Sequence, residues 1–170
     1  MNIQKVYVGV DPGLSGAIAC VDNNGRLLDV FDMPVVTLKI NRGVRNEISI
    51  PLLIEIFKTL KPKFNAEIFA CLEKVHGMPK MGGAAMFSFG RCFGHLEALL
   101  AALEISYEAV PPQTWKKAIF NAKAKDKDAA RILAMQIFPH ASSNFTRKKD
   151  DGRAEAALMA EYMRRRQSGR

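Results

Sequence analysis

The chain begins with the alternation of apolar and polar residues typical of strands. Residues 5–10, 16–22 and 26–33 read as three strands, joined by turns at Asp11-Pro12-Gly13 and Asn23-Asn24-Gly25. Connections this short join neighbouring strands in opposite directions. The pattern therefore predicts an antiparallel meander at the start of the fold.

Longer elements follow the meander. The polar stretch 34–48 has no clear period and is either a loop or an extra hairpin. Beyond it, the pattern predicts a helix of about 12 residues capped by Ser49 and closed by Pro62, strands over 67–73 and 105–110, a long helix over 84–104, helices over 113–120 and 126–138, a loop over 139–149, and a helix over 151–165. A mixed five-stranded sheet with helices on both faces accommodates this α/β order, which is that of the ribonuclease H-like fold.

Length and composition indicate one globular domain over residues 1–170. Of the 170 residues, 48% are hydrophobic and 25% are charged. The three cysteines, Cys20, Cys71 and Cys92, match neither a disulfide framework nor a zinc site, which favours a reducing compartment. We expect no signal peptide and no membrane span, because the sequence has no apolar run of sufficient length.

Charge is distributed unevenly along the chain. The net charge is +8, from 25 Lys and Arg against 17 Asp and Glu. Residues 1–110 are net neutral, so the whole surplus lies in residues 111–170. This segregation is expected when one surface binds a polyanion such as nucleic acid. A solvated basic surface that aids solubility explains the charge equally well.

Four acidic positions predict a metal site. Asp11 ends the first strand and Glu73 the fourth, and carboxylates that end parallel strands emerge at the same edge of a sheet. Asp151 and Glu155 lie four residues apart at the start of the last helix, so they share one of its faces. Gathered carboxylates repel one another unless a cation lies among them, and hard oxygen ligands suit Mg²⁺ or Mn²⁺. Phosphoryl transfer with two metal ions about 4 Å apart needs such a site.

These carboxylates also have purely structural interpretations. Asp11 before Pro-Gly can be a turn residue, and Asp150 or Asp151 can be the N-cap of the last helix. Glu73 is harder to explain in this way, because it closes a run of apolar residues.

Three segments resemble the RuvC-type Holliday-junction resolvases, particularly the small phage and bacterial versions. They are residues 8–13 (VGVDPG), residues 71–75 (CLEKV) with the Met- and Gly-rich segment and long helix that follow, and residues 150–156 (DDGRAEA). The resemblance covers about residues 5–163. It implies a ribonuclease H-like fold and a homodimeric endonuclease of DNA recombination and repair, which cuts two strands of a four-way junction symmetrically. It further implies two Mg²⁺ ions per active site, replaceable by Mn²⁺, and a cytoplasmic location in a bacterial cell or a phage-infected host.

The resemblance assigns catalytic and metal-binding roles to the acidic residues. It implies that Asp11, Glu73, Asp151 and Glu155 hold the metal ions. Asp150 is the alternative to Asp151, which we prefer because its four-residue spacing keeps it on the same helix face as Glu155. The last motif departs from the family pattern, which commonly has two acidic residues about one turn apart ending in Asp-Ala.

The resemblance also assigns residues to DNA contact. Lys116 and Lys127 match lysines that similar resolvases place at the scissile backbone, where they would neutralise charge in the transition state. The same lysines can also simply lie on an exposed helix face. His76 stands where similar enzymes can hold an aromatic residue that stacks on a base at the junction centre. The expected phosphate contacts beside the acidic pair are Arg147, Lys148, Lys149 and Arg153. Trp115 is expected to be a core anchor.

The long helix near residues 84–104 is where resolvases of this type dimerise. Gly90 and Gly94 would permit close approach of a partner helix, whereas Phe89 and Phe93 can instead bury against the sheet of the same chain. A two-fold dimer suits a substrate of near two-fold symmetry.

Two other functions are compatible with parts of the sequence. A non-catalytic junction-binding protein would keep the basic surface, but the intact carboxylates argue against it. A small actin-like ATP phosphotransferase also begins with a strand, an Asp and a Gly turn, but it needs a second domain and glycine-rich phosphate loops. We therefore expect no nucleotide cofactor.

Overall fold

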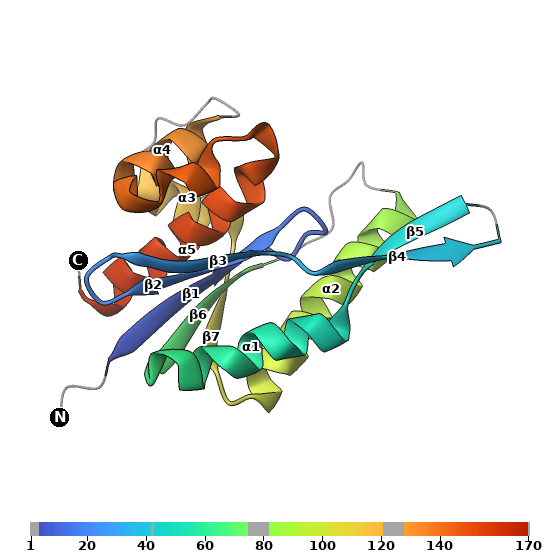
Figure 1. Cartoon of the computed structure of the whole chain (residues 1–170), viewed down its shortest axis with the longest axis horizontal. Coiled ribbons are helices and arrows are strands. Elements are labelled where there is room, and N and C mark those ends of the chain that lie inside the picture. Colours follow the sequence, from blue (N-terminus) through green and yellow to red (C-terminus); the bar gives the residue numbers. More distant parts are fainter. Residues whose placement is uncertain (1–3, 42, 75–81, 121–127, 170) are drawn as a thin grey trace.

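The computed structural model describes residues 4–41, 43–74, 82–120 and 128–169. The main sheet consists of β1 (Lys5–Val10), β2 (Ala17–Asp22), β3 (Leu27–Asp32), β6 (Glu67–Glu73) and β7 (Ser106–Val110). The strand order is β3-β2-β1-β6-β7. The first three strands pair antiparallel, whereas β6 is parallel to β1 and β7 is parallel to β6. The predicted mixed five-stranded sheet is confirmed (Figure 1).

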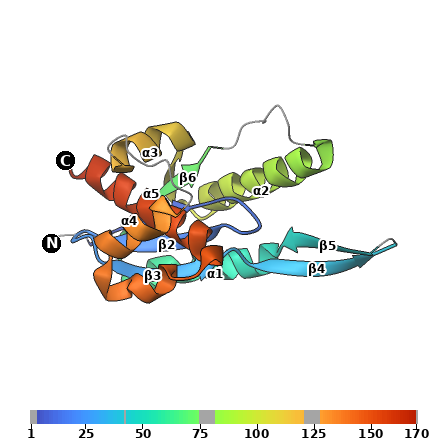
Figure 2. The same ribbon diagram turned by 90° about the horizontal axis from the view of Figure 1, so that it is seen from above.

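Helices cover both faces of this sheet, as predicted (Figures 1 and 2). One face carries α1 (Ile50–Phe64) and α2 (Gly83–Ala102). The other carries α3 (Pro112–Phe120), α4 (Ala129–Ile137) and α5 (Asp151–Gln167), with 3-10 turns at Pro139–Phe145 and Lys148–Asp150. Alternate residues of β1 divide between the two cores, because successive side chains of a strand point to opposite faces. Val6, Val8 and Val10 pack on the α1–α2 side, and Tyr7 packs on the α5 side.

The stretch after β3 forms a hairpin rather than a loop. β4 (Val35–Ile40) and β5 (Gly43–Ile48) pair antiparallel as a separate two-stranded sheet. The hairpin projects beyond the main sheet, beside the N-terminal half of α2 (Figures 1 and 2). An ion pair of 2.7 Å between Glu47 of β5 and Arg91 of α2 joins the two elements.

The first helix continues beyond the residue expected to close it. Pro62 lies inside α1, which ends at Phe64 before a left-handed Asn65 with a φ of 44°. A proline in the last turn removes little of the helical hydrogen bonding, so this turn tolerates it. The turn that follows α2 stabilises this continuation, because Lys61 Nζ donates to the carbonyl oxygens of Leu103 and Glu104 at 3.0 Å each.

Helix α5 lies unusually close to β1 and to the loop that follows it. A Cβ atom at Gly9 would overlap the carbonyl oxygen of Ala156, and a Cβ atom at Gly152 would overlap that of Ser15. Only glycine permits such close approach of two backbones. The two glycines therefore hold the N-terminal half of α5 against the end of β1, where Asp11 lies.

No helix in the described ranges is long and apolar enough to cross a membrane. Cys20, Cys71 and Cys92 are free and buried. Burial raises the pKa of the Cys71 and Cys92 thiols to about 12, so neither is a reactive thiolate at neutral pH.

Candidate active site

Three carboxylates from three different elements lie at one edge of the main sheet. Asp11 directly follows β1, and Glu73 is the last residue of the parallel strand β6, whose Leu72 is in register with Val10. Glu155 lies near the start of α5, which packs on β1. The charges of Glu73 and Glu155 both act on Asp11. The parallel pairing and the glycine-dependent packing of α5 thus bring together residues 144 positions apart.

The pKa of Asp11 reports this crowding. It is raised to about 7, first by burial and then by the negative charges of Glu73 and Glu155. A hydrogen bond from the backbone N–H of Gly13 and the positive charge of Lys116 lower it by smaller amounts. The environment therefore favours either a proton or a cation at Asp11.

Helix α3 contributes two polar contacts to this edge. The indole Nε1 of Trp115 donates a 2.9 Å hydrogen bond to Oε1 of Glu73. The next residue, Lys116, donates from Nζ to Oε1 of Glu155 at 2.6 Å. The structure thus places Lys116 beside Glu155, within range of the charge of Asp11.

The other two acidic residues of the last motif point elsewhere. The carboxylate of Asp151 is half exposed and accepts a 2.8 Å hydrogen bond from Nε of Arg131 on α4. Asp150 is buried and accepts 2.8 Å hydrogen bonds from both the backbone N–H and the guanidinium of Arg147, which lower its pKa. The structure therefore does not bring Asp150 or Asp151 into the gathered set, although Asp151 and Glu155 are on one helix.

The basic residues expected at DNA fall into two groups. Arg147 forms an ion pair with Asp150. Arg153 forms a bidentate ion pair with Asp32, in which Nε and Nη2 donate to the two carboxylate oxygens at 2.5 and 2.6 Å. Lys148 and Lys149 are exposed, and no residue of the described ranges pairs with their ammonium groups. The other two predicted contacts, His76 and Lys127, lie outside the described residues.

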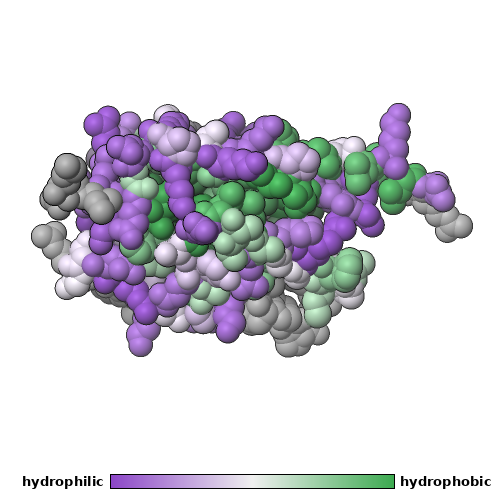
Figure 3. All heavy atoms as spheres, turned by 90° about the horizontal axis from the view of Figure 1, so that it is seen from below, coloured by the Kyte–Doolittle hydropathy of each residue, from purple (hydrophilic) through white to green (hydrophobic). Residues whose placement is uncertain are grey.

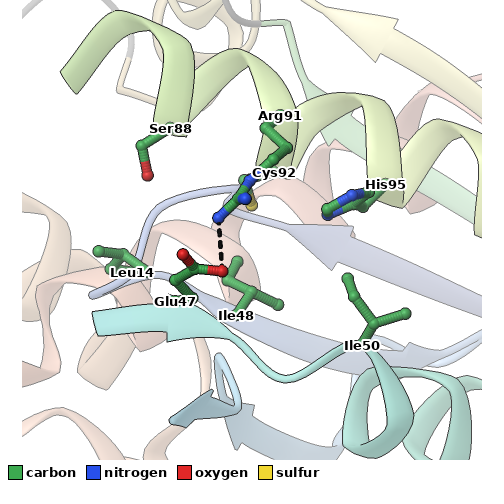
Figure 4. A pocket seen from close by; sticks show the side chains of 8 residues that line it. All are labelled: Leu14, Glu47, Ile48, Ile50, Ser88, Arg91, Cys92 and His95. Atoms are coloured by element: carbon green, nitrogen blue, oxygen red, sulfur yellow. Dashed lines mark ion pairs between the residues drawn. The ribbon is translucent and has the colours of Figure 1, made fainter. Parts of the chain in front are cut away.

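A small pocket lies between β5 and α2, close to the acidic edge (Figure 4). The Arg91–Glu47 ion pair crosses it, and Leu14 lines it from the loop that follows Asp11. Cys92 also lines it, and the negative charge of Asp11 contributes to the raised pKa of this thiol. The hairpin is therefore anchored next to the gathered carboxylates.

The gathered residues suit a divalent cation by their chemistry. Asp11, Glu73 and Glu155 offer the hard oxygen donors that Mg²⁺ and Mn²⁺ prefer, and a cation would relieve the repulsion that raises the pKa of Asp11. They do not form a preformed cage. Among the described residues, no three His, Cys, Asp or Glu side chains lie close enough together to hold an ion.

The sequence analysis missed three contacts, two of which have a signal in the sequence. Gly9 interrupts a β-branched strand, which is typical of a close backbone approach. Gly152 in the first turn of α5 likewise indicates a close backbone approach. The bond from Trp115 to Glu73 has no local signal, because it joins residues 42 positions apart.

Comparison with known proteins gives similarity in structure only. No family model matches the chain, and no curated protein is significantly similar to it in sequence. Thermus thermophilus RuvC in complex with a Holliday junction substrate is similar with a TM-score of 0.59 and 12% identity, covering 97% of this chain and 96% of that chain. A second structure of Thermus thermophilus RuvC gives a TM-score of 0.53 and 13% identity, covering 94% of this chain and 95% of that chain.

The yeast mitochondrial Holliday junction resolvase Ydc2 is similar with a TM-score of 0.58 and 18% identity, covering 95% of this chain and 78% of that chain. All three matches extend over nearly the whole of this chain, in agreement with the resemblance seen in its motifs. The chain therefore has the ribonuclease H-like fold of the RuvC-type Holliday junction resolvases.

Proposed function

We propose that this protein is a RuvC-type, metal-dependent endonuclease that resolves four-way DNA junctions. The observation that carries the proposal is the gathering of Asp11, Glu73 and Glu155 at one sheet edge, with Lys116 beside them. The fold likeness to resolvases, one of them in complex with a Holliday junction, supports this choice of substrate.

The residues at this edge have different chemical roles in the proposed reaction. Divalent ions held by Asp11, Glu73 and Glu155 would supply an activated water and stabilise the leaving oxygen. Lys116 lies in the same group and provides positive charge for the phosphate as its negative charge grows. Asp151 remains our proposed fourth ligand, with Asp150 as the alternative. To bind a metal ion there, the Asp151 carboxylate would have to give up its hydrogen bond from Arg131.

Four of the expected DNA-binding residues lie just before α5 or in its first turn. Lys148 and Lys149 are exposed just before α5 and are suited to phosphate contact. Arg147 and Arg153 would reach phosphate while retaining part of their pairing with Asp150 and Asp32. His76 and Lys127 stay in the proposed contact set on the sequence resemblance alone.

We further propose a homodimer through α2. Gly90 and Gly94 lie on the exposed side of this helix, and a Cβ atom at either would meet nothing within 4 Å in this chain. A glycine inside a helix lowers its stability by up to about 1 kcal/mol relative to alanine. Because neither glycine packs against another part of this chain, we infer that both pack against a partner chain. Phe87 on the same side is 71% exposed. From the side of α1 and α2, apolar side chains gather across the middle of the molecule (Figure 3).

The assignment of the carboxylates is tested with substitutions that preserve shape. We expect Asp11→Asn and Glu73→Gln to lose at least about 100-fold in the rate of junction cleavage in Mg²⁺, because each removes a ligand charge. Both should bind the junction as well as the wild type or better, since each also removes a charge that repels DNA. Cleavage by either variant near the wild-type rate would contradict the proposal.

Asp150→Asn and Asp151→Asn form a matched pair for the last motif. Loss of cleavage in Asp151→Asn alone would identify Asp151 as the fourth ligand. Asp150→Asn instead removes a buried carboxylate that binds Arg147, so we expect it to lower thermal stability. Cleavage by Asp150→Asn therefore has to be measured at a temperature where the variant is folded.

A further inference from the structure

Trp115 has a role that burial alone does not explain. Its side chain is fully buried in the core on the α5 side of the sheet, with the ring of Phe120 6.2 Å away between centroids. The indole N–H nevertheless emerges at the acidic edge and donates to Glu73 at 2.9 Å. An indole is a donor only, and a buried ring holds that donor in a fixed direction. Glu73 therefore receives a hydrogen bond from a rigid group.

The same turn of α3 serves a second carboxylate. Lys116 donates to Glu155 at 2.6 Å, and its Nζ lies 5.1 Å from the centre of the Trp115 ring. Two consecutive residues thus hold carboxylates that come from β6 and from α5. Helix α3 lies beside both elements (Figure 2). It starts directly after β7 ends at Val110, whose carbonyl accepts from Lys74 N–H next to Glu73 at 2.8 Å.

Orientation matters for a glutamate in a metal site. The last torsion of a glutamate side chain is broad, so a free carboxylate samples many directions. Groups that hydrogen-bond a metal ligand fix its direction, and their loss typically costs about 10–100-fold in metal affinity or activity. Among the described residues that contact Glu73, Trp115 combines a fixed ring with a neutral donor, which orients the carboxylate without cancelling its charge.

We propose that Trp115 is a positioning residue that orients the Glu73 carboxylate for metal binding. This role rests on the proposed function and deepens it, because it assigns a supporting residue to the same site. The sequence alone gave Trp115 only the role of a core anchor, which its burial also fulfils.

The kinetic test compares Trp115→Phe with Phe138→Leu. The first keeps an aromatic ring and removes the N–H, whereas the second disturbs the same core without touching a carboxylate. We expect Trp115→Phe to raise the Mg²⁺ concentration for half-maximal cleavage by about 10–100-fold while saturating Mg²⁺ restores most of the rate. Junction affinity in Ca²⁺ should stay unchanged. Phe138→Leu should leave the Mg²⁺ dependence as in the wild type.

A spectroscopic test needs no change at Trp115 and no catalysis. Trp115 is the single tryptophan of the chain, so the tryptophan emission and the indole N–H vibration report on this residue alone. Glu73→Ala removes the acceptor and should shift both signals, whereas Glu73→Gln keeps a carbonyl acceptor and should stay close to the wild type. Identical signals in the wild type and Glu73→Ala would overturn the proposed contact.

The two tests separate this proposal from the proposed function. A wild type that cuts no junction DNA with any divalent ion overturns the function, and the role of Trp115 falls with it. An active wild type whose Mg²⁺ dependence is unchanged in Trp115→Phe overturns the role of Trp115 alone.

Discussion

The carboxyl group of Asp11 is the residue on which the electrostatics of the site converge. It is partly withdrawn from water at the end of β1 and faces Glu73 and Glu155, and these effects raise its pKa to about 7. The unfolded chain keeps the ordinary value near 3.8. Between these two values the folded protein binds more protons than the unfolded chain. The stability of the metal-free protein therefore falls as the pH rises through this range.

Asp11→Asn should therefore change the pH dependence of stability. Each pH unit between the two pKa values changes the free energy of unfolding by about 1.4 kcal/mol in the wild type, and the uncharged Asn escapes this loss. In EDTA, the free energy of unfolding of the variant should rise relative to that of the wild type between pH 4 and pH 7. Urea denaturation should show a difference of about a few kcal/mol at pH 7. Mg²⁺ at pH 8 should narrow the difference, because it stabilises only the carboxylate. A difference that is the same at pH 4 and pH 8 would contradict the burial of this charge.

The sequence predicted the place of a candidate residue where the end of a strand determines it. Asp11 and Glu73 follow from the pairing of two parallel strands, and Lys116 follows from the family resemblance. The orientation of Asp151 did not follow, because its partner Arg131 belongs to another helix. Helical spacing predicts which residues share one face of a helix, but it does not predict which charged residue of another element each of them contacts.

Helix α5 is the element that completes the carboxylate group. Four of its buried residues are alanines, whose short side chains leave little volume between the helix and the sheet: Ala154, Ala156, Ala157 and Ala160. Together with Gly9 and Gly152, they allow α5 to approach β1 closely. The position of Glu155 therefore depends on the small side-chain volume at the contact between α5 and β1.

Adding one methyl group at Gly9 should displace this helix. Gly9→Ala would place a Cβ atom against the backbone of α5, and we expect a loss of about 1–3 kcal/mol in urea denaturation, as for other overpacked cores. Cleavage should fall as well, because Glu155 moves with the helix. Gly82→Ala is the matched control, since its Cβ atom would meet nothing within 4 Å. Equal stability and activity of the two variants would show that α5 is not held in place by Gly9.

At the level of elements, the sequence was least informative where an element lacks a buried face. The β4–β5 hairpin leaves Val36, Leu38 and Ile40 between 36 and 46% exposed, so its apolar face is not buried against the rest of the described chain. Its interpretation therefore stayed open between a loop and a hairpin. Helix α1 ran past Pro62 because contacts from Lys61 to the end of α2 stabilise its last turn.

For the whole molecule, the segregated positive charge is only partly available to a polyanion. Most arginines of the last third are paired with acidic residues, including Arg164 and Arg165 with the buried Glu161 and Arg166 with Glu108. Just before α5, Lys148 and Lys149 are exposed and have no acidic partner among the described residues. Composition gave the net charge correctly, but it could not tell structural arginines from exposed lysines.

The proposed dimer determines how a junction is cut. Phe93 packs against the core below α2, so a charge there would disturb the fold, whereas Phe87 is exposed and probes the outer side of the helix. We expect Phe87→Glu to be a folded monomer in light scattering and to nick junctions without pairing the cuts. Ile132→Glu, an exposed position on α4, should behave as the wild type.

The most direct measurement is cleavage of a supercoiled plasmid that extrudes a cruciform. Two active sites facing two symmetric strands should cut within one binding event, so the wild type with Mg²⁺ should yield linear DNA as its first product. Asp11→Asn should leave the plasmid supercoiled, and Phe87→Glu should accumulate nicked circles. Nicked circles as the main wild-type product, or equal cutting of a plasmid without a cruciform, would contradict a junction-resolving endonuclease.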